Sequence, residues 1–157
     1  MKQSVKLIPI LFALFLFACG SGEDKSDSGD AGNNSPAQSM VEDEPDPMEN
    51  KGVGPVSSVT LGDEVDADLA ASGETLFNEK CTACHKPDTK SIGPAPKGIL
   101  DRRTPEWVMN MILNPEEMVL QDPIAKQLLI DFNGAPMANQ SLTEDEARSI
   151  LEYFRTL

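Results

Sequence analysis

The sequence has few of the residues from which disulfide frameworks and metal clusters are built. It contains one histidine and three cysteines in 157 residues, so a fold held by several disulfides is excluded. Basic residues are also few, because 13 lysines and arginines stand against 26 acidic residues, for a net charge of -13. Such a chain is not expected to bind nucleic acid, which proteins contact mainly through lysine and arginine. The length fits one domain with appendages rather than two domains.

Two of the three cysteines and the single histidine fall within five residues, Cys-Thr-Ala-Cys-His at 81–85. This spacing is typical of a c-type haem attachment site. The thiols of Cys81 and Cys84 can bond the two vinyl groups of one porphyrin, and His85 is then held beneath the iron as an axial ligand. We therefore predict one covalently bound haem c with its iron.

Two other uses of a Cys-x-x-Cys pair are less consistent with the sequence. A structural zinc site needs four nitrogen or sulfur ligands, but the only cysteine left is Cys19, far upstream in a different kind of sequence. A thioredoxin-like dithiol is expected near a βαβ pattern, and none is present. A zinc-binding or dithiol module remains the alternative if no haem is attached.

The N-terminal residues have the layout of an export signal. Lys2 and Lys6 precede an apolar run over residues 7–17 and a small Ala18, and the run is too short for a membrane-spanning helix. Cys19 follows in a sequence that resembles the lipobox of bacterial lipoproteins, in which this cysteine is lipidated. The alternative is an ordinary cleaved signal with a free thiol. We expect a lipid anchor in the cell envelope, with the domain in the periplasm or on the outer surface.

Residues 19–66 are rich in Ser, Gly, Pro, Asn, Asp and Glu and have no aromatic residue or sustained apolar period. Such a composition is typical of disorder, because too little apolar surface is available to offset the entropy of ordering. We predict three parts: a signal peptide over residues 1–18, the lipidated cysteine with a flexible acidic linker over residues 19–66, and one folded domain over residues 67–157.

The domain reads as all-α, with four to five short helices and no convincing alternating strand. A helical pattern leads directly to Cys81, and two proline-containing segments, residues 91–98 and 135–142, are expected to be loops. Capping residues followed by proline or by glutamate mark the other helix starts. These starts are Thr104-Pro105, Asn114-Pro115 with Glu117, Asp122-Pro123, and Thr143 with Glu146.

Together these features resemble a class I cytochrome c. The resemblance covers residues 67–157 and is carried by the haem motif, Gly93-Pro94, Gly98, Pro136-Met137 and a closing helix that ends in Ile-Leu-Glu-Tyr-Phe at 150–154. It implies the cytochrome c fold, a set of short helices around one covalently attached haem. It also implies that Gly73 and Phe77 of the first helix pack across the last helix.

The resemblance further implies roles for single residues around the haem. His85 would be the proximal ligand, with Pro94 accepting a hydrogen bond from its second ring nitrogen, and Met137 would be the distal ligand. Met111 and Met118 are the next candidates for that position. Arg102 would bind a haem propionate, with Arg103 as its neighbouring rival, and the indole of Trp107 would either bond a propionate or pack at the haem edge.

With both axial positions filled by protein, no open iron site remains for a substrate, so we expect a monomeric electron carrier and not an enzyme. If Met137 is not a ligand, a five-coordinate haem sensor or weak peroxidase is the alternative. We expect redox proteins as partners, and residues 103–115 are similar to small cytochromes that supply periplasmic reductases, nitrous oxide reductase among them. Four lysines near the motif either steer docking or form a solvated face: Lys80, Lys86, Lys90 and Lys97.

Overall fold

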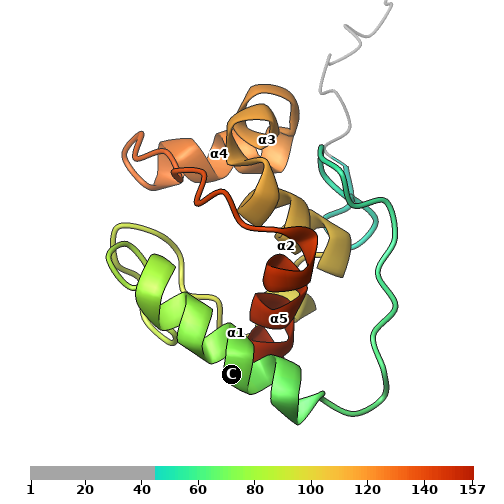
Figure 1. The fold of residues 1–157 in the computed structure, drawn as a ribbon. Coiled ribbons are helices and arrows are strands. Elements are labelled where there is room, and N and C mark those ends of the chain that lie inside the picture. Colours follow the sequence, from blue (N-terminus) through green and yellow to red (C-terminus); the bar gives the residue numbers. More distant parts are fainter. Residues whose placement is uncertain (1–44) are drawn as a thin grey trace, which may run out of the picture. The chain divides into compact units, whose positions relative to one another are not determined.

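The computed structural model describes residues 45–157, and the signal segment and Cys19 lie outside the described residues. The described part contains five α-helices, one 3-10 turn and no strand, which confirms the all-α prediction (Figure 1). None of its helices is long and apolar enough to cross a bilayer. The elements in chain order are α1 (Ala67–Lys80), η1 (Ile99–Asp101), α2 (Pro105–Leu113), α3 (Pro115–Gln121), α4 (Pro123–Asp131) and α5 (Glu144–Phe154).

Helices α2 to α5 begin at the positions predicted from capping residues and prolines. The Thr104 hydroxyl accepts from the Trp107 N–H at 3.1 Å, and Thr143 and Glu146 form the predicted capping box. The capping box predicted at Asn114 is wrong, because its side chain makes no cap hydrogen bond. Asn114 is also the C-cap of α2. Its N–H donates to the Asn110 carbonyl and its φ is -139°, so the end of α2 fixes the backbone conformation of Asn114.

The first and last helices cross in close contact, as the resemblance implied. A Cβ on Gly73 would lie within 2.8 Å of backbone atoms of Ser149 and Ile150, so only glycine lets the two backbones approach this closely. One turn further on, the Phe77 ring packs on Tyr153, with 5.4 Å between ring centroids. This crossing fixes the C-terminal end of α1, and with it the position of Cys81.

Residues 45–66, which we call the strap, pack along the helices rather than forming the flexible linker predicted for them (Figure 1, teal to green). Val56 of the strap is buried in the core cluster. Asn110 of α2, only 1 % exposed, accepts from the Val56 N–H at 2.9 Å. Its amide group also donates to the carbonyls of Val56 and Lys51, both at 2.9 Å. The ordered part therefore includes residues 45–66, which composition alone had assigned to the linker.

A second side chain of α2, Glu106, faces the strap one helical turn before Asn110. Its carboxylate accepts from the Val59 N–H at 3.1 Å and lies 3.4 Å from the Lys51 ammonium. Burial would raise the pKa of Glu106, but backbone hydrogen bonds and Lys51 outweigh it and lower the pKa overall. The charged form that binds the strap therefore persists below the usual pH of glutamate titration.

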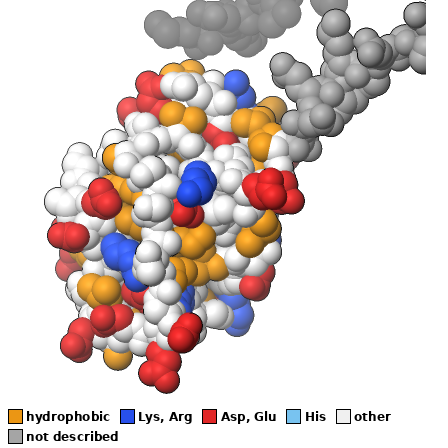
Figure 2. Space-filling model, turned by 90° about the vertical axis from the view of Figure 1, so that its right-hand side faces the viewer, with side chains coloured by type: hydrophobic (Ala, Val, Ile, Leu, Met, Phe, Trp, Pro, Cys, Tyr) orange, Lys and Arg blue, Asp and Glu red, His pale blue; other side chains and the backbone are white. Residues whose placement is uncertain are grey.

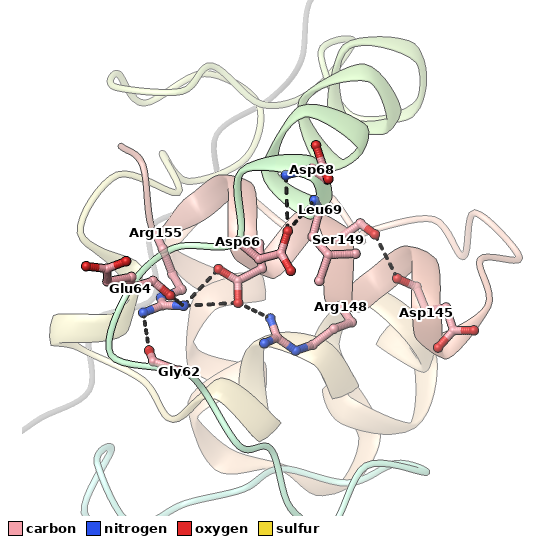
Figure 3. A network of polar contacts seen from close by, with 10 residues as sticks. Gly62, Glu64, Asp66, Asp68, Leu69, Asp145, Arg148, Ser149 and Arg155 are labelled. Atoms are coloured by element: carbon pink, nitrogen blue, oxygen red, sulfur yellow. Dashed lines mark hydrogen bonds and ion pairs between the residues drawn. The ribbon is translucent and has the colours of Figure 1, made fainter.

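The strap's far end is held by Arg155, the residue that directly follows α5 (Figure 3). Arg155 donates to the Gly62 carbonyl at 2.7 Å and to the Glu64 carbonyl at 3.1 Å. Its guanidinium also pairs with Glu152, which is 1 % exposed and lies between Arg155 and Arg148, at 2.8 and 2.6 Å. A carboxylate this buried needs such partners, because an unpaired charge in the interior is costly.

Figure 2 looks onto the side of the molecule along which the strap runs. Acidic side chains lie mostly around the edge of this face, and hydrophobic side chains show through its middle. The strap thus covers part of an apolar surface of the helices, and three of its four valines, Val53, Val56 and Val59, join the core cluster.

We expect Asn110→Ala to lower the free energy of unfolding by about 2 kcal/mol or more, because it leaves three strap backbone groups without partners. Urea titration measures this loss, and trypsin cleavage after Lys51 should become faster as the strap loosens. The control is Asn78→Ala on exposed α1 surface, which should change stability by less than about 0.5 kcal/mol. Equal stability of the two variants would contradict the role of Asn110.

Candidate functional site

The helices and loops of the fold surround a large, partly open apolar cavity of about 260 Å³. Its walls come from α1, the segment 81–103, α2, α4, the segment between α4 and α5, and α5 itself. Protein interiors are packed densely and contain few voids larger than a water molecule. A hollow of this size and lining is therefore built for a large apolar ligand. The wall residues include Phe77, Val108, Ile112, Leu128, Phe132 and Phe154.

The Cys-x-x-Cys-His motif lies in the wall of this cavity. Cys81 closes the end of α1 with its N–H on the Phe77 carbonyl, 2.9 Å away, and the His85 N–H bonds the Cys81 carbonyl at the same distance. This tight turn brings both cysteines and the imidazole to one cavity. Cys81 is half-buried and Cys84 is exposed, so the pair reaches from the interior to the cavity mouth.

The imidazole of His85 is fixed by two neighbouring residues. Its Nδ1 lies 2.8 Å from the Pro94 carbonyl oxygen, and because a carbonyl can only accept, Nδ1 carries the proton. The lone pair is then on Nε2, the nitrogen available to a metal. Gly93 lies against the ring, since a Cβ there would come within 2.9 Å of three ring atoms. The contact with Pro94 is the one that the resemblance implied.

Met137 lines the same cavity from the segment that joins α4 to α5. In Figure 1 this orange-red segment lies opposite the yellow-green loop that follows α1, and the cavity lined by both lies between them. Asn139, two residues on, ties the segment to the end of α2 by donating to the Leu113 carbonyl at 3.2 Å. Met137 and His85 thus line one cavity from two different segments of the chain.

The two rival methionines differ in position. Met118 is completely buried, and its sulfur accepts from the Val53 N–H of the strap at 2.9 Å, so it is occupied away from the cavity. Met111 does line the cavity, from within α2. Two methionines, Met111 and Met137, therefore remain as candidates for a sulfur ligand.

The two adjacent arginines have different surroundings, although both line the cavity. Arg102 is exposed and donates to the carbonyls of Lys97 and Ala95 at 3.3 Å. Arg103 has a buried Nε without a protein partner, and burial, helped by Arg102, lowers its pKa against the opposing effect of Asp122. An unpaired buried donor in a cavity wall calls for an acceptor on the ligand, which a haem carboxylate would supply. Sequence reasoning placed Arg103 second to Arg102, because it could not show which side chain is buried.

The indole of Trp107 is already paired within the protein. Its Nε1 donates to the buried carboxylate of Asp122 at 3.1 Å, and its ring packs under the Arg103 guanidinium, 5.3 Å from the ring centroid. Of the two roles expected for Trp107, packing at the cavity wall fits this geometry, and the hydrogen bond to a propionate does not.

A zinc site has no ligand set in the described residues. No group of three or more His, Cys, Asp and Glu side chains gathers anywhere between residues 45 and 157. Burial, and to a smaller extent the nearby Cys84, raises the pKa of the Cys81 thiol. Zinc needs thiolate ligands, whereas an uncharged thioether suits an apolar wall, so the surroundings of Cys81 fit haem attachment better.

The four lysines near the motif are all exposed. Lys80 also lines the cavity, and the Lys90 ammonium lies 4.4 Å from the centroid of the Phe132 ring. The lysines therefore lie on the surface around the haem motif, and two of them contact the cavity region directly.

Comparisons with known proteins agree with this geometry. Residues 70–157 match the family model described as cytochrome c. Cytochrome c-551 of Ectopseudomonas mendocina is 33 % identical over 88 residues, which cover 55 % of this chain and 99 % of that protein. The solved structure of a cytochrome c from Rhodothermus marinus is 48 % identical with a TM-score of 0.63, over 66 % of this chain and 88 % of that one. An engineered form of that cytochrome, bound to a carbene intermediate, is 47 % identical with a TM-score of 0.61, over 66 % and 88 % of the two chains.

We expect Gly93→Ala to lower the yield of haem-loaded protein by about tenfold, because the added methyl group collides with the His85 ring and disturbs its bond to Pro94. The absorbance of purified protein, normalised to total polypeptide, measures the yield. Gly62→Ala is the matched control, since a Cβ there meets only the Glu64 carbonyl at an ordinary 3.5 Å. Normal loading of the Gly93 variant would show that the ring is not confined as the structure indicates.

Proposed function

The chain belongs to the cytochrome c family, and on this basis we propose that it carries single electrons through a haem whose attachment and ligation fall to Cys81, Cys84, His85 and Met137. The family binds haem c covalently, and bound haem supplies a one-electron change at its iron. One observation carries the proposal. An imidazole fixed by Pro94 and Gly93 shares an apolar cavity with two correctly spaced cysteines and a methionine.

The residues of the chain have three tasks in this function. The apolar walls keep water from the redox centre, which lowers the local dielectric constant and favours the less charged reduced state. Pro94 holds His85 in the tautomer that a metal needs. Arg103 offers its unpaired Nε to a carboxylate at the cavity wall. An imidazole with a thioether raises the reduction potential relative to harder ligand pairs.

The alternative of a five-coordinate sensor or weak peroxidase depends on whether the sulfur of Met137 is bound. An engineered cytochrome similar to this chain is described as bound to a carbene intermediate. Positive φ angles occur on both sides of Met137, at Asn133, Gly134 and Ser141, so the segment is a turn-bounded loop rather than part of a helix. The distinction therefore rests on whether a sulfur binds the iron, from Met137 in this loop or from Met111 in α2.

We expect Met137→Ala to lower the reduction potential by on the order of 0.1 V and to let the reduced protein bind CO, because the iron loses its thioether. Potentiometric titration and the Soret shift on addition of CO measure these effects. Met111→Ala is the control, since it removes the other cavity methionine. If the Met111 variant binds CO and the Met137 variant does not, the ligand is Met111. If the unaltered protein binds CO rapidly, the sensor or peroxidase alternative holds.

We also propose that the protein is anchored in the cell envelope by lipid on Cys19. The support is in the sequence alone: a signal-like segment over residues 1–18 followed by a lipobox-like cysteine. One acyl chain binds a membrane only marginally, whereas two or more give stable anchoring. The haem domain would then work in the periplasm or on the outer surface, beside membrane-associated partners.

Cys19→Ser should move most of the protein from the membrane pellet to the soluble fraction, because the lipid has no attachment site. Fractionation with immunodetection of the polypeptide in both fractions measures the change. Cys84→Ser controls for the effect of losing a cysteine, since it disturbs haem attachment without touching the anchor. A Cys19 variant that still sediments with membranes would contradict the anchor.

For partners, we propose other redox proteins that meet the monomeric domain near the haem motif. The exposed lysines at positions 80, 86, 90 and 97 support an acidic docking surface on the partner, because charge complementarity raises association rates. Residues 103–115 are similar to small cytochromes that supply periplasmic reductases. A reductase of this kind, such as nitrous oxide reductase, is therefore the proposed electron acceptor.

A further inference from the structure

The carboxylate of Asp122 joins three parts of the molecule while being only 3 % exposed. Its Oδ1 accepts from the Trp107 indole at 3.1 Å and from the Ala125 N–H of α4 at 2.8 Å. Its Oδ2 accepts from the Asn50 amide of the strap at 2.6 Å. A residue that only caps a helix usually lies at the surface. The burial and the two side-chain donors give Asp122 more contacts than capping requires.

One of the groups that Asp122 holds, the Trp107 indole, lies in the wall of the haem cavity. Trp107 and Arg103 both line its wall, and the Arg103 guanidinium packs on the Trp107 ring. The buried Nε of Arg103 has no protein partner. A fixed indole therefore supports the Arg103 cation in the cavity wall. The buried Asp122 carboxylate holds that indole and attracts the charge of Arg103.

We propose that Asp122 is a positioning residue for the redox centre, and that the strap, through Asn50, shares in setting the reduction potential. This inference rests on the proposed electron-carrier function. A buried negative charge stabilises the oxidised, more positive state and so holds the potential down. Asp122 also offsets the charge of Arg103, whose positive field would otherwise favour reduction.

The proposal differs from a purely structural role in what it predicts for the potential. If Asp122 only caps α4 and anchors the strap, its loss lowers stability and leaves the potential of the folded holoprotein unchanged. If it acts on the redox centre, the potential moves even where the fold is intact. The two effects are measured separately on the same holoprotein.

The test compares Asp122→Asn with Asp131→Asn in full-length holoprotein. Both changes remove one negative charge at an end of α4, where Asp122 is the N-cap and Asp131 the last residue, but Asp131 is exposed. We expect Asp122→Asn to shift the equilibrium constant for reduction by roughly three- to tenfold toward the reduced form, where tenfold is about 59 mV for one electron. The control should shift it by less than about twofold, since solvent screens an exposed charge.

A second variant tests the part played by the strap. It leaves Asp122 in place, so no new amide group is buried among the donors that surround this carboxylate. Asn50→Ala keeps the Asp122 charge but removes its donor on the strap, so water reaches the carboxylate and its field at the cavity weakens. We expect a shift in the same direction as for Asp122→Asn but smaller. Near-UV circular dichroism of Trp107, the only tryptophan, should change in both variants and not in the control.

The possible results distinguish a failure of this inference from a failure of the proposed electron-carrier function. A potential for Asp122→Asn equal to that of the Asp131 control, with lower stability in urea, overturns the positioning role. An unchanged potential in Asn50→Ala, with the strap loosened, overturns the coupling to the strap. Failure of the proposed function would show in the unaltered protein instead, as an absent haem spectrum or rapid CO binding.

Discussion

The hollow at the centre of this domain is the constraint on which the rest of the structure depends. Side chains that would meet in the core of an ordinary helical domain, such as Val108, Ile112 and Phe154, instead line a common cavity. Dense packing is reached only when a large apolar group fills that space. The described cysteines form no disulfide, so a haem in this cavity would supply both the redox centre and the packing in the middle of the core.

The parts of the fold that could be predicted from sequence are those with local causes. A proline at the first helical position fixes the starts of α2, α3 and α4, and the capping box of Thr143 and Glu146 fixes that of α5. The site was predictable for the same reason, because the haem motif spans five residues and Pro94 follows it closely. Gly73 was informative because a glycine inside a helical pattern usually marks a close backbone approach.

The strap was not predictable because its partners are distant in sequence and its own composition resembles a linker. Its backbone groups are paired by Glu106, Asn110 and Arg155, which lie 47 to 93 residues away along the chain. A composition argument counts only the apolar surface that a segment brings, not the polar groups that the domain prepares for it. The same limit affected the arginines, because burial, not sequence position, distinguishes Arg103 from Arg102.

The buried side chains of Asn110 and Asp122 pair with polar groups of the strap and fix its position along the helices. Three valines alone would let an extended segment slide along an apolar surface at little cost, since hydrophobic contact is not directional. Asn110 accepts and donates at fixed positions on Val56 and Lys51, and a shift of the strap would leave these buried groups unpaired. Asp122 fixes the position of Asn50 in the same way, because it accepts a hydrogen bond from the Asn50 amide. Because Asp122 also bonds Trp107 in the cavity wall, the register of the strap and the surroundings of the redox centre depend on one carboxylate.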